Sequence, residues 1–142
     1  VLQGALAVRC TAALIADPDA GCTYAVSEDD DPEARFAAPD ALGGRMQELA
    51  LAAAGALHAR GDRAWGAALL AAGTDGRDGP TDAAGAIVDA RTWAAIGRAG
   101  RDPAADLAAH RSHQALAAAG ALIPAAPTGT NVADVVVAVV LR

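Results

Sequence analysis

Apolar residues recur with a helical period in one segment of the chain and as continuous runs in two others. After the glycine pair of ALGGRMQE, five apolar residues share one helix face, which predicts a helix closed by Gly61. These residues are Met46, Leu49, Ala50, Ala53 and Leu57. The run AWGAALLAAG predicts a buried strand over about 67–72, and the valine-rich end of the chain predicts a strand over about 135–141.

Turn and capping residues indicate the remaining elements. TWAAIGRAG predicts a helix, and the segment 102–120 predicts one further helix with Asp102 as its N-cap and Pro103 in its first turn. A helix ending near Ala16 and short strands at CTYAV and ARFAA are expected earlier in the chain, whereas AAGAIVD is too short to assign. Helices that alternate with apolar strands predict an α/β fold, formed as a single domain over residues 1–142 with a mixed sheet flanked by helices.

The composition limits both the core and the partners. Apolar residues make up 54% of the chain and aromatic residues only 3%, so Ala, Val, Leu and Ile must fill the core. The net charge is −6, and all 11 basic residues are arginines. A chain without a basic face is a poor ligand for nucleic acid, so we expect no nucleic-acid partner.

The chain also lacks signals for membranes or secretion. VVVAVVL is far shorter than the roughly 20 residues that a membrane-spanning helix needs. No basic start with a small-residue cleavage site is present, and Cys10 and Cys22 are too few and too far apart to suggest a disulfide framework or a zinc site. We therefore expect a cytoplasmic protein with reduced thiols and no membrane contact.

A glycine-rich acidic loop, GTDGRDGPTD, follows the predicted central strand. Its carboxylates, Asp75, Asp78 and Asp82, are candidates for holding Mg²⁺ or for accepting hydrogen bonds from a substrate hydroxyl. Their spacing does not match a calcium-binding loop. The alternative interpretation is an ordinary turn in which Asp82 caps the next element.

Two further segments have the composition of anion sites. In GGRMQE, Arg45 opens a helix after two glycines, so its guanidinium and the helix dipole can act together on an anion, with Glu48 on the same face. PTGTN offers the side chains of Thr128, Thr130 and Asn131 to phosphate or carboxylate, although the same residues also suit a turn.

Other motifs are absent or weak. The chain has no G-x-x-x-x-G-K-[ST], G-x-S-x-G or G-x-G-x-x-G sequence. His110 and His113 are one helical turn apart, but without a third ligand on their face a surface pair is favoured over a metal site. The residues alone thus indicate an anion or metal crevice and no specific reaction.

The order of the motifs adds a resemblance. GGRMQELAL, AAGTDGRDGPTDAAGAIVD, HRSHQALAAAGALI and PTGTNVADV together resemble the carboxyl-terminal MOFRL domain of type 2 glycerate kinases, which are also named hydroxypyruvate reductases. The likeness runs from about Gly4 to Arg142. It implies a two-domain enzyme that uses ATP and Mg²⁺ to phosphorylate the 2-hydroxyl of D-glycerate, in a cleft shared with an amino-terminal partner domain.

The resemblance also implies roles for individual residues. Arg45 would neutralise a substrate carboxylate or phosphate, and Asp75 and Asp78 would hold either Mg²⁺ or the hydroxyl groups of glycerate. The crevice would be lined by Glu48, Asp75, Asp78, Thr81 and Asp82, and closed by Thr128, Thr130 and Asn131. On this hypothesis the isolated chain lacks half of the cleft and is inactive, and a homodimer is left open.

Several positions depart from the family pattern. SEDD (27–30) stands where family members usually carry SGGE, and His113, Ala126 and Met46 replace a usual aromatic residue, glycine and asparagine. Two alternative functions follow: a hydroxypyruvate reductase, which the missing dinucleotide motif disfavours, and a diverged, non-catalytic regulatory or scaffolding domain.

Overall fold

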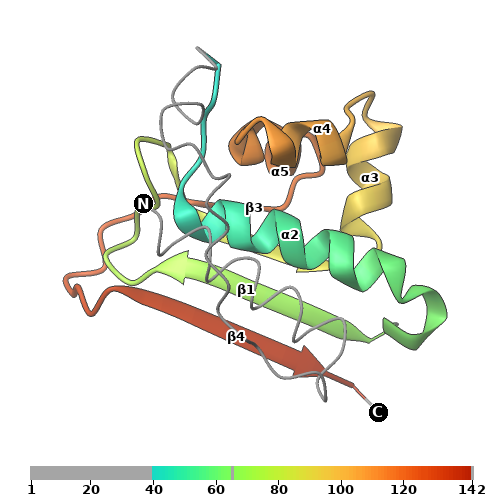
Figure 1. Ribbon diagram of the computed structural model, residues 1–142. Helices are drawn as coiled ribbons and strands as arrows, with labels where there is room; N and C mark the ends of the chain where they lie inside the picture. The colour runs from blue at the N-terminus through green and yellow to red at the C-terminus, as the bar shows by residue number, and fades with distance from the viewer. Residues whose placement is uncertain (1–39, 65, 142) are drawn as a thin grey trace, which may run out of the picture.

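The computed structural model describes residues 40–64 and 66–141, which form an α/β domain with its helices on one face of a four-stranded sheet (Figure 1). The helix expected before Ala16, the strands expected at CTYAV and ARFAA, and the SEDD run lie outside the described residues. Within these ranges, no helix is both long and apolar enough to cross a membrane.

The elements follow one another in the order helix, two strands, three helices and two strands. The helices are α2 (Arg45–Ala59), the short 3₁₀ turn η2 (Gly61–Ala64), α3 (Thr92–Arg98), α4 (Pro103–Ala108) and α5 (Ser112–Ala118). The strands are β1 (Ala67–Gly73), β2 (Ala83–Asp89), β3 (Leu122–Pro124) and β4 (Asp134–Val140). The expected strands near 67–72 and 135–141 are β1 and β4, and the unassigned AAGAIVD is β2.

The sheet has the order β3-β2-β1-β4, and its described pairs are all antiparallel. Leu70 of β1 is the partner of Ile87 on one side and of Val137 on the other. The α/β class is confirmed, but the described sheet differs from the mixed sheet expected from the sequence. The loop 74–82 between β1 and β2 is shorter than the crossover of about a dozen or more residues that a parallel pair needs.

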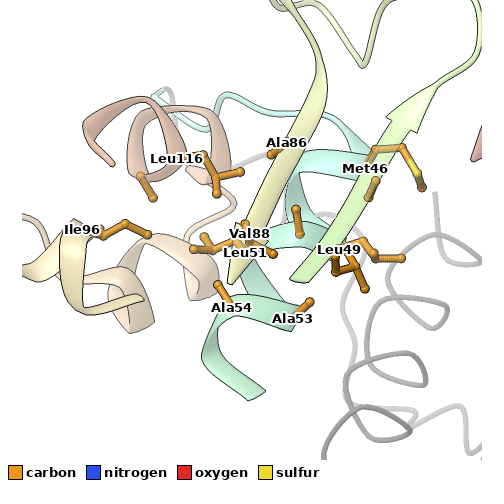
Figure 2. Packing of buried hydrophobic residues seen from close by; sticks show 13 residues of the cluster. Met46, Leu49, Leu51, Ala53, Ala54, Ala86, Val88, Ile96 and Leu116 are labelled. Atoms are coloured by element: carbon orange, nitrogen blue, oxygen red, sulfur yellow. The ribbon is translucent and has the colours of Figure 1, made fainter. Parts of the chain in front are cut away.

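Helix α2 supplies much of the core. Its predicted apolar face is buried, and it packs against β1 and β2 on one side and against α3, α4 and α5 on the other (Figures 1 and 2). Ala50 and Ala54 are fully buried, and they bring the helix backbone close to its neighbours because their side chains are small. Leu51, Val88, Ile96 and Leu116 fill the remaining volume.

The single helix expected over 102–120 is wrong: the structure has α4 and α5, separated at Ala109–Arg111. His110 adopts a left-handed conformation with φ of 56°, and the Arg111 N–H donates to the Asp106 carbonyl oxygen at 2.8 Å, which closes α4. The buried Ser112 then packs against Gly43, where a Cβ would lie 2.1 Å from its Oγ. Hydrophobic periodicity does not reveal this tertiary contact.

Asp102 caps α4, as the sequence predicted. Its Oδ1 accepts hydrogen bonds from the backbone N–H groups of Ala104 (2.9 Å) and Ala105 (3.1 Å). Asp102→Ala is expected to lower the free energy of unfolding by about 1 kcal/mol, since it leaves these N–H groups without their cap. Chemical denaturation would measure the change, and Asp102→Asn, which keeps an acceptor, is the matched control. Equal losses in the two variants would contradict a capping role.

Candidate active site

The candidate residues lie at one end of the sheet (Figure 1). Because β1 is antiparallel to β2 and β4, its carboxyl end at Gly73 lies beside the amino ends of those strands at Ala83 and Asp134. The loop 74–82 and the loop 125–133 therefore leave the same end of the sheet, where α2 also begins. This arrangement of antiparallel strands brings the three sequence motifs together.

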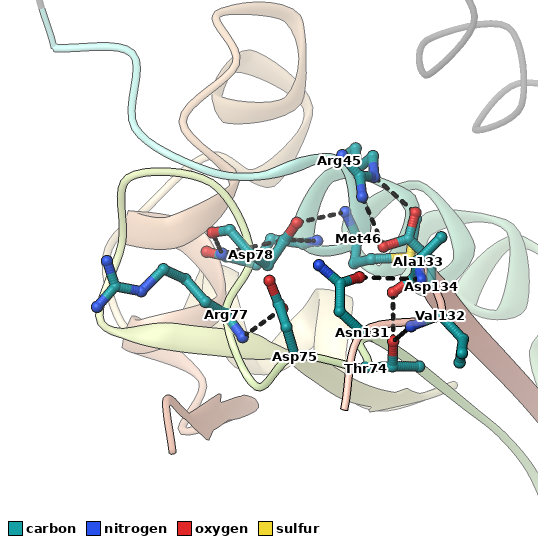
Figure 3. A network of polar contacts seen from close by, with 11 residues as sticks. Arg45, Met46, Thr74, Asp75, Arg77, Asp78, Asn131, Val132, Ala133 and Asp134 are labelled. Atoms are coloured by element: carbon teal, nitrogen blue, oxygen red, sulfur yellow. Dashed lines mark hydrogen bonds and ion pairs between the residues drawn. The ribbon is translucent and has the colours of Figure 1, made fainter. Parts of the chain in front are cut away.

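Arg45, the first residue of α2, forms a two-pronged ion pair with Asp134 at the start of β4 (Figure 3). Its Nε and Nη2 donate to the two carboxylate oxygens at 2.6 and 2.9 Å, and 60% of the Arg45 side chain remains exposed. The hydrogen bond to Asp134 raises the pKa of Arg45 above its ordinary value, and the charges of Asp78 and Asp75 add to this effect. Arg45 is therefore a fixed cation that solvent can still reach.

Asp134 was not among the candidate residues expected from the sequence. Its signal is a single charged residue that opens an otherwise aliphatic strand, DVVVAVV. The valines of β4 are exposed, so burial does not explain this position, and the role of Asp134 becomes clear only from its contact with Arg45.

Asp78 is 3% exposed and faces the start of α2 rather than solvent (Figure 3). Its Oδ1 and Oδ2 accept hydrogen bonds from the backbone N–H groups of Met46 (3.1 Å) and Gln47 (2.7 Å). Gly44, the N-cap residue of α2, has no side chain to do this. The anion site expected at GGRMQE is thus filled by a carboxylate of the same chain.

Gln47 extends this contact into the interior of the loop. It is fully buried, and its Nε2 donates to Thr81 Oγ1 at 2.9 Å and to the Asp78 carbonyl oxygen at 3.0 Å. Thr81 is also buried, and its hydroxyl donates to the same carbonyl at 2.8 Å, so Thr81 braces the loop from inside. Gln47 was not expected from the sequence, where its signal is a polar residue among the apolar positions of α2.

Asp75 differs from Asp78 because it is exposed. Its Oδ1 accepts a hydrogen bond from the backbone N–H of Arg77 at 3.1 Å, and its Oδ2 accepts none from the described residues. In Figure 3 its side chain lies between Asp78 and Asn131. Asp75 therefore has a carboxylate oxygen that accepts no hydrogen bond from the described residues and is available to a ligand.

The loop that carries Thr128, Thr130 and Asn131 is held against the acidic loop by Thr74. The hydroxyl of Thr128 donates to the Thr74 carbonyl oxygen at 2.5 Å, and the Thr74 hydroxyl donates to the Ala133 carbonyl oxygen at 2.8 Å. Thr128, Thr130 and Asn131 are exposed. The structure thus places them beside the acidic loop, and Thr74, which lies within the GTDGRDGPTD motif but was not a candidate site residue, bridges the two loops.

Glu48 and Asp82 each pair with a histidine rather than with Arg45: one histidine lies in the α4–α5 turn and the other in the first turn of α5. Glu48 Oε1 is 2.5 Å from His110 Nδ1, and Asp82 Oδ1 is 2.7 Å from His113 Nε2. The hydrogen bond from His113 holds the pKa of Asp82 below its ordinary value. The two histidines, expected to be a surface pair, are instead each matched to a carboxylate of a candidate site residue.

Two observations limit what the site contains. In the part of the chain that the structure describes, no cluster of three or more His, Cys, Asp or Glu side chains is arranged to hold a metal ion. A cavity of about 280 Å³ lies between Gly66 and Arg91, at the other end of β1 from Asp75. That cavity is separate from the end of the sheet at which the motifs meet.

The fold and this site define an α/β domain whose antiparallel sheet carries an arginine–carboxylate cluster at one end. A model of the MOFRL family matches residues 33–134. The chain belongs to the MOFRL family.

Similar proteins include named kinases. The D-glycerate 2-kinase of Thermotoga maritima is 48% identical over 100 residues, which are 70% of this chain and 23% of that protein. The glycerate 2-kinase of Pyrococcus horikoshii is 44% identical over 98 residues, 69% of this chain and 21% of that protein. The chain thus spans less than a quarter of these relatives, and the name hydroxypyruvate reductase also occurs among similar proteins.

Solved structures agree with the fold. The crystal structure of a glycerate kinase from Thermotoga maritima superposes with a TM-score of 0.67 at 36% identity, covering 97% of this chain and 32% of that one. A protein structure from Pyrococcus horikoshii gives a TM-score of 0.65 at 32% identity, with 96% and 30% covered.

Proposed function

We propose that the chain is the carboxyl-terminal domain of a glycerate 2-kinase, which transfers the γ-phosphoryl group of Mg·ATP to the 2-hydroxyl of D-glycerate together with an amino-terminal partner domain. The similarity to named glycerate 2-kinases supports this proposal, as does the short share of those proteins that the chain spans. We place the enzyme in the cytoplasm.

One observation carries the proposal: Arg45, Asp75 and the loop with Thr128 and Asn131 meet at one end of the sheet (Figure 3). Phosphoryl transfer depends mainly on positioning and on neutralising negative charge. Arg45 supplies a permanent cation for a substrate carboxylate or phosphate. The hydroxyl of Thr130 and the amide NH₂ of Asn131 bind phosphate or substrate oxygens, while the Thr128 hydroxyl, which donates to the Thr74 carbonyl oxygen, holds their loop in place.

Asp75 fits a Mg²⁺ ion that arrives with a nucleotide. Mg²⁺ usually keeps several waters and takes one or two carboxylates in addition to substrate phosphates. Asp75 has an oxygen free of hydrogen bonds from the described residues, whereas both oxygens of Asp78 accept N–H groups. When bound, the ion neutralises charge on the phosphates, and Asp75 orients it relative to Arg45.

The remaining candidates shape the site from further away. We assign Glu48 and Asp82 to holding the α4–α5 turn and the start of α5, because each carboxylate is hydrogen-bonded to a histidine of that region, His110 or His113. Thr81 stabilises the acidic loop from its interior.

We expect these 142 residues alone to transfer no phosphoryl group. Phosphoryl transfer needs several positive charges around the γ-phosphate, and the chain has no lysine and a net charge of −6. The test compares the isolated chain with a chimera in which it replaces the matching segment of the Thermotoga maritima kinase, by following 2-phosphoglycerate formation from D-glycerate and Mg·ATP.

Turnover by the chimera, and none by the isolated chain, is the expected result. Metal-dependent product from the isolated chain would contradict the need for a partner. A folded chimera that binds Mg·ATP but forms no product would contradict the kinase proposal, and NADH oxidation on hydroxypyruvate by that chimera would replace it with the reductase.

A further inference from the structure

Asp78 is bonded through its backbone and through both oxygens of its side chain. Its N–H donates to the Ala83 carbonyl oxygen at 2.8 Å, its carbonyl accepts from Gln47 and Thr81, and its carboxylate accepts from Met46 and Gln47. A single residue thus ties the acidic loop to the start of β2 and to the first turn of α2. None of these contacts is used by the phosphoryl transfer proposed above.

The chain makes room for this contact with glycines. A Cβ at Gly44 would lie 2.2 Å from Asp78 Cγ, and a Cβ at Gly79 would lie 2.9 Å from Gly44 Cα. Both distances are too short for a side chain. The glycine before Arg45 and the glycine after Asp78 therefore serve the approach of the loop to the helix.

The contacts of Asp78 lie next to the two side chains that the proposed reaction needs, Arg45 and Asp75. Arg45 immediately precedes Met46, whose N–H is held by Asp78, and Asp75 lies on the same loop. The first N–H groups of a helix have no partner within the helix, so their position depends on an external acceptor. A displacement of the Asp78 carboxylate would move Arg45 relative to Asp75.

We propose that Asp78 is a positioning residue whose carboxylate, by capping α2 from the acidic loop, fixes the distance between Arg45 and Asp75, and that it is not a metal ligand. Its consequence for catalysis rests on the proposed kinase function. Its structural part, the cap on α2 and the anchoring of Arg45, stands independently of that function.

The first test needs no activity. In the folded wild-type chain, the amide protons of Met46 and Gln47 are expected to exchange slowly with solvent, because both donate to a buried carboxylate. Hydrogen exchange followed by NMR measures each amide directly. Rapid exchange of both amides, as in an uncapped first turn, would overturn the proposal.

The second test compares Asp78→Asn with Asp75→Asn, a matched change on the same loop. Asp78→Asn removes a charged acceptor, so exchange at Met46 and Gln47 should rise roughly ten- to a hundredfold. The Arg45 Nε proton, bonded to Asp134, should exchange faster as well. Asp75→Asn should change none of the three, because the Asp75 carboxylate has no bond to α2.

Titration with Mg²⁺ and kinetics in the active assembly separate positioning from metal binding. Asp78→Asn is expected to lower kcat at least about tenfold while the Mg²⁺ dependence stays near wild type, whereas Asp75→Asn should raise the Mg²⁺ concentration needed for half-maximal activity. A weaker Mg²⁺ affinity in Asp78→Asn with unchanged amide exchange would show that Asp78 binds the metal instead.

If Asp78→Asn does not fold, the exchange measurement on the wild-type chain still shows whether Asp78 caps α2. If no assembly is active, the proposed function fails while the exchange data still test the positioning of Arg45.

Discussion

Arg45→Ala is expected to reduce kcat/KM of the assembled enzyme by roughly 30- to 1000-fold, equivalent to about 2–4 kcal/mol of transition-state stabilisation. The reason is the geometry of the guanidinium: Asp134 holds it in one orientation, and more than half of the side chain faces solvent at the site. Without it, negative charge on the substrate has no cation from this domain. Steady-state kinetics with D-glycerate and Mg·ATP would measure the loss.

Asp134→Asn is the matched control for this prediction. It keeps the Arg45 cation but removes the charged partner that orients it, so a smaller loss than in Arg45→Ala is expected. Wild-type kcat/KM in Arg45→Ala would contradict the role of Arg45. A larger loss in Asp134→Asn would assign the main effect to Asp134.

Local sequence patterns were sufficient for the elements that build the core. The helical face from Met46 to Leu57 is buried in α2, and the apolar runs are β1 and β4, because each depends on the periodicity of neighbouring residues. The cap by Asp102 is similarly local, since the acceptor and its donors are within three residues.

Features that depend on distant contacts were not predictable in this way. The break between α4 and α5 arises where Ser112 packs against Gly43, and the antiparallel sheet follows from a short loop rather than from strand composition. Hydrophobic periodicity holds no information on which distant segments meet, so it predicted a helix that continues through His110.

The candidate site shows the same division. The sequence placed Arg45 and Asp75 in motifs with the right chemistry, and the structure brings them to one end of the sheet. The sequence alone could not distinguish Asp75 from Asp78. In the structure Asp75 is exposed, whereas Asp78 is only 3% exposed and faces the start of α2. Both aspartates lie in the same glycine-rich loop, three positions apart, so the local sequence gives no sign that one carboxylate is exposed and the other buried.

Gly76→Ala is expected to separate the two loops of the site and to lower the free energy of unfolding by about 2–5 kcal/mol. This loss is the sum of the strain of an alanine in a left-handed backbone conformation and the cost of overpacking. Gly76 has φ of 83°, and a Cβ there would lie 1.7 Å from the carbonyl oxygen of Ala126. The Ala126 N–H also donates to the Gly76 carbonyl oxygen at 3.1 Å. The added methyl group therefore breaks a backbone contact that no rotamer change can restore. Chemical denaturation would measure the loss.

Gly129→Ala is the matched control, because it introduces the backbone strain without the steric contact that Gly76→Ala makes with Ala126. Gly129 has a similar φ of 76°, but a Cβ there would meet no atom of the described residues within 4 Å beyond its chain neighbours, so only the conformational cost of about 1–2 kcal/mol is expected. If the two variants lose equal stability, the close approach of the loops at Gly76 contributes nothing, and the left-handed backbone alone explains both. A clearly larger loss in Gly76→Ala shows instead that the acidic loop and the threonine loop are held together by this backbone contact. The positions of Asp75 and Thr128 would then depend on a residue that has no side chain.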